Sequence, residues 1–262
     1  KELMKKTDPA GATPLLFSLL LKQREIGKYF IEQFPERALD KYTAGYEDTG
    51  EYEGENALHL AIVNNDLAIV KKLIELDEKL LWGKAIGPFF QHPKKCYYGE
   101  LPLSFAVCLG HLDIVKYLLS LNDELARKLL KAQDDCLGNT ALHMAVHRNK
   151  IDMYDELVKL YEKSGVNVND LRNHKKQSVF TYAAEVGKKE TFLHLMDKRK
   201  QIIWNFGPVT CSGYPLEELD TMHGIDGRRG AIEYLTDGGE DRLELFELDR
   251  IKELISKKWE SY

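Results

Sequence analysis

The chain has 262 residues, of which 44% are hydrophobic and 30% are charged, a balance that excludes a disordered chain. Its 37 basic residues against 42 acidic residues give a net charge of -5, so the overall charge gives no reason to expect a nucleic-acid binder, whose phosphate contacts need a basic surface. No apolar stretch reaches the length of a membrane span, about 20 residues. The 4 cysteines form no CxxC pair, so we expect a reducing, cytosolic setting. The start lacks both an initiator methionine and the apolar core of a signal peptide, and we expect a piece of a longer chain.

Five segments repeat one pattern along the chain, and each is followed by a second apolar stretch. They are GATPLLFSLL from Gly11, GENALHLAIVNND from Gly54, GELPLSFAVCLGH from Gly99, GNTALHMAVHRNK from Gly138 and, less regularly, KQSVFTYAAEVGK from Lys176. In the second stretches, apolar residues recur at i, i+1, i+4 and i+5, which is the spacing of one helix face. We therefore predict a helix, a turn and a second helix in each unit, stacked so that neighbouring units bury each other's apolar faces.

Residue types at fixed places support this unit. The glycine that opens a copy suits a turn with positive φ, and two copies have a proline at the first helical position, where the missing N–H costs nothing. Gly110 and Gly187, with Asn65 and Asn149 at the matching place, are suited to end the first helix in the left-handed conformation. The recurring pattern resembles the T-P-L-H-x-A signature of the ankyrin repeat.

The spacing between copies is longer than in plain ankyrin repeats. Successive copies begin 43, 45, 39 and 38 residues apart, whereas a plain repeat has about 33 residues. Because the helix–turn–helix parts align without gaps, we expect the surplus in the loops that follow each second helix, which form the fingers of such a stack. Long loops of this kind are typical of a working face.

The loop at residues 80–100, which we call the long finger, is the most unusual. It combines five aromatic residues with glycines, prolines and two lysines. The candidate protein-binding residues in it are Trp82, Phe89, Phe90, Lys94, Lys95, Tyr97 and Tyr98. Aromatic residues are enriched at interface hot spots, and the lysines would steer acidic partners. The alternative, that the aromatic residues pack the finger onto its neighbours, stays open, and different rings can serve either purpose.

Two further features resemble the cytosolic ankyrin domain of TRPV channels, the vanilloid-type transient receptor potential channels. The long finger runs into YYGELPLSFA, which is followed by DCLGNTALHMAV. The segment WNFGPVTCSGYPLEELDT at 204–221 resembles the linker of that family, W-x-x-G-P-x-x-x-x-x-Y-x-L-x-x-x-D. Its VTCSGYPL part is more similar to invertebrate sensory members than to vertebrate heat-sensing ones. The resemblance covers essentially the whole chain.

The resemblance implies an all-α solenoid of six ankyrin repeats with long finger loops. Residues 1–200 would form repeats one to five, 201–229 a linker, and 230–262 a degenerate sixth repeat and an exit helix toward the channel coupling region. The parent would be a tetrameric, calcium-permeable cation channel, with this region on the cytoplasmic side of the plasma membrane and the pore helices after residue 262. The implied role is assembly with other channel subunits, as a homo- or heterotetramer, and regulation. A free-standing cytosolic ankyrin scaffold is the alternative, although such a scaffold has no need of the linker.

The ATP site known for some members of the family is degraded in this chain. The lysines of the G-K-T-x-L-L-K pattern in those members correspond to Ala12 and Phe17 here. Tyr52 keeps the aromatic residue of that site, whereas Glu55 replaces a glutamine and Val63 a glutamate. Because two cations are lost and an anion is gained, a triphosphate is disfavoured. We predict weak ATP binding or none, with Tyr52 and Glu55 as the remaining candidate ligand-binding residues.

The sequence gives no enzyme signature. His143 and His147 lack the glutamate of an H-E-x-x-H zinc site. His143 and His59 occupy the histidine place of the repeat, which predicts a bond to the neighbouring turn. We therefore predict no catalytic residue, no metal and no cofactor, and a glycine-rich run at 224–230 is predicted to be a mobile surface loop.

Charged segments suggest two regulators besides ATP. The basic runs at 172–176 and 188–200 are read as solvated faces, with a phosphoinositide or membrane surface as the alternative partner. The last helix places Ile251 and Ile255 beside Lys252, a pattern that also occurs in calmodulin targets. Packing against the sixth repeat would explain the same apolar side.

Overall fold

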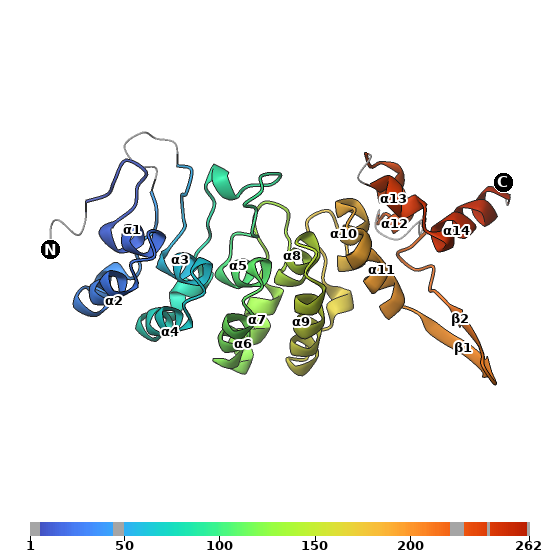
Figure 1. Cartoon of the computed structure of the whole chain (residues 1–262), viewed down its shortest axis with the longest axis horizontal. Coiled ribbons are helices and arrows are strands. Elements are labelled where there is room, and N and C mark those ends of the chain that lie inside the picture. Colours follow the sequence, from blue (N-terminus) through green and yellow to red (C-terminus); the bar gives the residue numbers. More distant parts are fainter. Residues whose placement is uncertain (1–5, 44–49, 221–227, 240–241, 261–262) are drawn as a thin grey trace.

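The computed structural model describes residues 6–43, 50–220, 228–239 and 242–260. Within these ranges, helix pairs follow one another in an elongated row, and successive pairs lie side by side from one end of the molecule to the other (Figure 1). None of the described helices has the length and apolar content of a membrane span. The glycine-rich run at 224–230 lies mostly outside the described residues.

Five units show the predicted order of helix, turn and helix. The first helices are α1 (Pro14–Leu20), α3 (Ala57–Val63), α5 (Pro102–Leu109), α8 (Ala141–His147) and α10 (Val179–Val186). The second helices are α2 (Arg24–Gln33), α4 (Leu67–Leu76), α6 (Leu112–Ser120), α9 (Ile151–Lys163) and α11 (Lys189–Lys198). Neighbouring first helices contact each other along the row, so the row forms a solenoid in which each unit packs only on the next.

One continuous hydrophobic core runs through these units. Its apolar side chains come from both helices of each pair, as the helical spacing predicts. A small buried residue in each first helix lets the next unit approach closely. These residues are Ser18, Ala61, Ala106, Ala145 and Ala183. Because no single pair covers its own apolar face, stacking provides the burial that stabilises the fold.

The turns have the predicted backbone conformations. The opening glycines all have positive φ, and Lys176 takes the same conformation (φ 59°) where the fifth copy has no glycine. At Gly138 (φ 71°) a Cβ atom would lie 2.3 Å from the His174 ring, so a side chain is excluded on steric grounds as well. Asn65 and Asn149 end their first helices with φ of 54° and 53°.

The surplus residues between units are not all loop. Short helical turns lie in the connections: η2 (Pro35–Arg37), η3 (Glu78–Trp82), η4 (Pro88–Phe90) and η5 (Val168–Asp170). After α6 the surplus forms a full helix, α7 (Asp123–Lys131), which packs against α6. The Asn122 side chain caps α7 by accepting from the Glu124 backbone N–H at 2.8 Å, and Leu129 and Leu130 are buried. The expectation that finger loops hold all of the surplus is therefore wrong at this connection.

The linker corrects the all-α prediction. Its two strands, β1 (Gln201–Phe206) and β2 (Val209–Gly213), pair as an antiparallel hairpin that projects from the row (Figure 1). Isoleucine, tryptophan, phenylalanine and valine favour extended backbone. Gly207, with φ 54°, occupies the turn between the strands. The described chain is thus mostly helical with one hairpin.

In the part of the chain that the structure describes, three further helices follow the hairpin. They are α12 (Ala231–Thr236), α13 (Leu243–Phe246) and α14 (Asp249–Glu260). α12 packs on α10 and so continues the layer of first helices, and α13 contacts α12 and α14. Leu245 and Ile251 are buried in this end of the core. The count of six repeats and the boundaries at residues 200 and 229 stay predictions.

Candidate interaction surfaces

The long finger presents only part of its aromatic set to solvent. Trp82 is 40% exposed, whereas Phe90 and Tyr97 are 2% and 0% exposed. Phe89 and Tyr98 are half-buried, and Lys94 and Lys95 are exposed. The seven selected residues thus divide into exposed residues that can meet a partner and buried residues that cannot.

Phe90 holds the finger onto the helices beneath it. Its ring centroid lies 5.2 Å from that of Phe89, 5.5 Å from Phe105 in α5 and 6.3 Å from Tyr52. Phe89 packs in turn on Tyr52, with the centroids 5.1 Å apart. Such tilted and edge-on pairs add to the energy of burial. The finger and the preceding turn at residue 52 therefore form one packed unit.

Tyr97 is fixed by a buried polar network. Its hydroxyl donates to the Asp134 carboxylate at 2.5 Å and accepts from the Asn139 amide at 3.0 Å. The same amide group donates to the Tyr182 hydroxyl at 3.0 Å, and that hydroxyl lies 2.9 Å from Nδ1 of His147. The network links the long finger to two later units, and it stabilises their alignment because every member has a partner.

Arg148, which directly follows α8, holds the tip of the finger. Its guanidinium donates to the carbonyl oxygens of Lys95 (2.5 Å) and Tyr97 (2.9 Å) and lies 4.7 Å from the centre of the Tyr98 ring. Lys94 forms an ion pair with Glu51 at 3.7 Å. The tip is thus held in one conformation with the Lys95 side chain exposed.

The exposed-anchor prediction needs correction for two residues. Phe90 and Tyr97 are packing residues, because a partner would have to unpack the finger to reach them. Trp82, Lys94 and Lys95 are accessible, and Phe89 and Tyr98 are half-buried. Protein binding by these residues stays a prediction.

Tyr52 and Glu55 lie at the base of the same finger. Tyr52 packs between Tyr42 (5.7 Å between centroids) and the two phenylalanines. Glu55 is 5% exposed, and no hydrogen bond or ion pair from the described residues reaches its carboxyl group. Burial without a cation raises the pKa of Glu55 to about 8. At neutral pH this carboxyl group is mostly protonated, so it is not the surface anion that the argument against ATP assumed.

The repeat histidines have the predicted structural role. Nε2 of His59 lies 2.9 Å from the carbonyl oxygen of Glu100, and Nδ1 lies 3.2 Å from the backbone nitrogen of Asn56. A carbonyl oxygen only accepts, so Nε2 carries the proton and Nδ1 accepts from the backbone N–H. His143 bonds the Gln177 carbonyl oxygen in the same way at 3.3 Å. Burial lowers the pKa of both histidines to about 4, so both are neutral.

The hairpin β1–β2 is the most exposed apolar surface in the described chain. Every residue of β1 is exposed, and Phe206 reaches 79%. The other exposed apolar residues of this segment are Ile202, Ile203, Trp204, Val209 and Leu216. Sequence reasoning treated this segment only as a linker. Its dense run of strand-forming residues before a Gly-Pro turn was the signal that could have predicted the hairpin.

Comparison with known proteins agrees with this architecture. The family model for ankyrin repeats in three copies matches residues 41–128, and the single ankyrin-repeat model matches 137–173. Transient receptor potential cation channel subfamily V member 6 of Homo sapiens is 31% identical over 261 residues, which is 96% of this chain and 32% of the relative. Member 5 of Homo sapiens is 32% identical over 96% of this chain and 34% of the relative. Member 2 of Mus musculus is 33% identical over 80% of this chain and 30% of the relative. The chain belongs to the TRPV channel family.

The chain spans about a third of the length of these TRPV relatives. The match coincides with the ankyrin repeats, the fold of a protein-interaction region. The closer likeness of the linker to invertebrate sensory TRPV members stays a prediction.

The basic runs of this TRPV chain are largely paired within the fold. Arg172 and Arg199 both bind the Glu218 carboxylate at 2.9 Å, and Lys198 reaches Asp155 at 3.3 Å. Lys175 likewise pairs with Glu185. These partners offset much of the positive charge that a phosphoinositide headgroup would need. Lipid binding stays a prediction with reduced support.

The last helix of this TRPV chain is partly occupied by internal packing. Ile251 is buried and Ile255 is half-buried in α14. A calmodulin-type partner would have to displace this packing, because it binds the apolar face of its target helix. Calmodulin binding stays a prediction.

Proposed function

We propose that the chain is the cytoplasmic assembly and regulatory region of a TRPV-type tetrameric, calcium-permeable cation channel at the plasma membrane. Its role is to contact other channel subunits, in a homo- or heterotetramer, and to transmit regulator binding to the gate. In this proposal α12 and α13 form a degenerate sixth repeat, and α14 leads toward the channel coupling region. The chain has no catalytic role and no nucleic-acid partner.

The observation that supports assembly best is the hairpin β1–β2. A two-stranded hairpin with both faces in water is at most marginally stable by itself. Exposed contiguous apolar surface is typical of interaction sites. Trp204 and Phe206 have the residue types that dominate interface energies. We infer that another subunit of the same channel covers this hairpin.

The accessible part of the long finger supplies a second contact surface. Trp82 offers a half-exposed aromatic side chain, and Lys94 and Lys95 project beside the packed tip. The lysines favour an acidic partner, and the solenoid holds both surfaces in a fixed relation. A regulator that binds the array can therefore bias the contacts between subunits. The candidate regulators are calmodulin through α14 and anionic lipid through the basic runs, with ATP weak or absent.

Assembly can be tested in the full-length channel with Trp204→Ser and Phe206→Ser combined. We expect the association constant of the tetramer to fall by roughly 30-fold for each hot-spot ring lost. Native mass spectrometry would show this as a smaller tetramer fraction. Helical circular dichroism should not change, because both rings are exposed. Ile26→Ser, at a 48% exposed side chain on α2, is the matched control and should leave assembly intact. An unchanged tetramer fraction in the double variant would contradict the proposal.

The alternative is a free-standing ankyrin scaffold, and sequencing the full-length transcript tests it. A channel subunit requires six apolar spans after residue 262. Their absence would leave the scaffold as the better hypothesis.

A further inference from the structure

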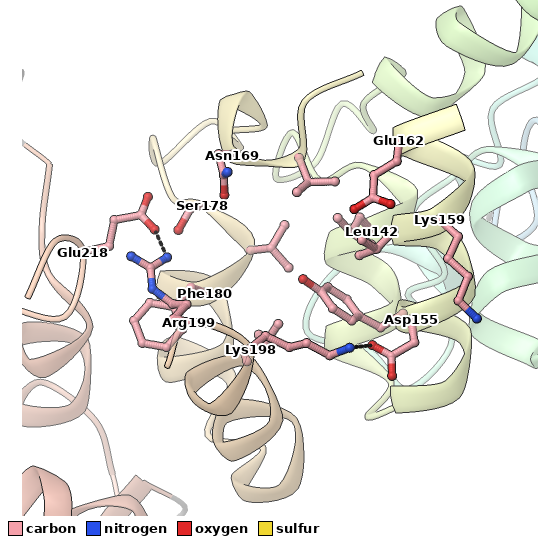
Figure 2. Close-up of a pocket in the computed structure, with 15 residues that line it drawn as sticks. Leu142, Asp155, Lys159, Glu162, Asn169, Ser178, Phe180, Lys198, Arg199 and Glu218 are labelled. Atoms are coloured by element: carbon pink, nitrogen blue, oxygen red, sulfur yellow. Dashed lines mark hydrogen bonds and ion pairs between the residues drawn. The ribbon is translucent and has the colours of Figure 1, made fainter. Parts of the chain in front are cut away.

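A cavity of about 540 Å³ lies between α9 and α11, on the side of the solenoid formed by the second helices (Figure 2). This volume falls within the range of small-molecule sites, about 300–1,000 Å³. None of the candidate protein-binding or ligand-binding residues selected from the sequence lines it, although Lys198 and Arg199 of the basic run at 188–200 do. The cavity is separate from the long finger and from the hairpin β1–β2.

The cavity is the gap between the side chains of α9 and α11, bounded also by α8, α10 and the η5 turn. α9 and α11 meet at one point: Nε2 of His194 in α11 lies 2.8 Å from the Asp155 carboxylate in α9, and the Tyr154 and His194 ring centroids are 6.2 Å apart. α9 has 13 residues, against 10 in α11, and the loop containing η5 leaves its end. The Lys198–Asp155 ion pair at 3.3 Å bridges the gap, as the dashed line in Figure 2 shows. The gap is thus framed by polar side chains and stays open between them.

The floor of the cavity is apolar. It is made by side chains from four helices and the η5 turn: Leu142, Tyr154, Val158, Val168, Val179, Phe180 and Leu195. The Tyr154 hydroxyl has no hydrogen-bond partner among the described residues, and burial raises the pKa of this group to about 12. The floor therefore suits the apolar, partly aromatic part of a ligand. The Tyr154 hydroxyl group can form a hydrogen bond with that ligand.

The cations at the rim are already paired. Lys198 is bound to Asp155, and Arg199 donates to Glu218 at 2.9 Å while its guanidinium lies 4.8 Å from the centre of the Phe180 ring. Lys159 pairs with Glu156, which lies outside the cavity lining, and its amine points away from the opening in Figure 2. An anionic ligand would have to break one of these pairs.

Glu162 is the uncommitted charge at the rim. Its carboxylate is exposed and forms no hydrogen bond or ion pair with the part of the chain that the structure describes. In Figure 2 it points toward the opening, opposite Asn169 and Ser178. A cation placed there gains a partner without the loss of an existing one.

We propose that this cavity binds a small amphipathic amine, with its apolar body on the floor and its single protonated amine at Glu162. The inference goes beyond the assembly role and does not depend on it. Lys198 and Arg199 lie three and two residues before the start of β1 at Gln201, so a bound amine would lie close to the base of the hairpin.

Three probes with one ring system separate the contributions of body and charge: 1-naphthylmethylamine, 1-naphthalenemethanol and 1-naphthoic acid. Each is titrated into the isotopically labelled 262-residue chain, and affinities are taken from NMR shift changes. We expect the amine to bind roughly two- to fivefold more tightly than the alcohol, the gain of one exposed ion pair. The acid should bind most weakly. An acid that binds as tightly as the amine, or no binding of any probe at millimolar concentration, would overturn the proposal.

Two variants locate the site. Val158→Trp fills the cavity and should weaken the binding of the amine and of the alcohol at least 10-fold. Leu76→Trp, at an exposed position of α4, should leave both affinities unchanged. Glu162→Gln should remove the advantage of the amine over the alcohol, and Glu75→Gln is its control. Because Glu162 is exposed, its variant will fold even where Val158→Trp does not. A Glu162→Gln protein that keeps the full preference for the amine would refute the assignment.

Discussion

Glu55 provides a test of the energetics at the base of the long finger. Its carboxyl group is buried without a hydrogen bond or a cation from the described residues, and its pKa is raised from the usual 4.5 to about 8. The unfolded chain ionises Glu55 near pH 4.5, while the folded chain resists ionisation until about pH 8. Over that interval the folded state binds more protons, so the free energy of unfolding falls as the pH rises.

The size of this effect follows from the two pKa values. The full difference corresponds to about 5 kcal/mol at about 1.4 kcal/mol per tenfold change in the ionisation constant. About 3 kcal/mol of this develops between pH 5 and pH 8. The Glu55→Gln variant keeps the size of the side chain and cannot ionise. Its stability relative to the unmodified chain should therefore rise by about 3 kcal/mol across the same interval.

The assay is urea denaturation of both proteins at several pH values, followed by circular dichroism. The buried histidines act in the opposite direction: their folded pKa of about 4 lies below the usual 6.5, so their contribution is lost as the pH falls. Because both proteins contain these histidines, the difference between them isolates Glu55. Glu53→Gln, at the exposed neighbouring glutamate, should show no such trend. A Glu55→Gln difference that stays constant from pH 5 to 8 would refute the reasoning.

Three further predictions concern packing. Phe90→Ala should lower the free energy of unfolding by about 3–5 kcal/mol because it empties a buried aromatic site, whereas Trp82→Ala should cost less than about 1 kcal/mol, both by urea denaturation. Gly138→Ala should destabilise more than Gly165→Ala in thermal unfolding. Both glycines have positive φ, but a Cβ atom clashes only at the first. Arg148→Lys should speed proteolytic cleavage of the long finger, because lysine lacks the planar group that stacks and donates to two carbonyl oxygens.

The repeat could be predicted from the sequence because its signals are local. Helical spacing, a proline at the first helical position and residues suited to the left-handed conformation each act within a few neighbours along the chain. The helix pairs of the five units and the roles of His59 and His143 followed from these signals. The helix α7 and the hairpin β1–β2 also had local signals, in Asn122 and its leucines and in the Gly-Pro turn. The surplus residues and the linker were expected to be loops, so neither element was predicted.

The division of the long finger could not be predicted in the same way. Phe89 and Phe90 are identical and adjacent in the sequence, yet only Phe90 is fully buried, because Phe105 of the next unit lies above it. Tyr97 is buried in a cluster with Cys108 and Met144 from later helices, and Asp134, 37 residues later, accepts its hydroxyl hydrogen. Burial of this kind depends on contacts between units, and no local pattern records them.

The length, composition and charge of the chain, together with its repeat, determined a stacked helical array of the ankyrin type and the resemblance to TRPV channels. The tertiary structure alone decided which finger residues are accessible, that Glu55 is buried and mostly uncharged, and that a cavity opens between α9 and α11. The physical reason is that local conformation is set by neighbours along the chain. Exposure, pKa and cavity volume are set by whichever side chains the stacking of the units brings together.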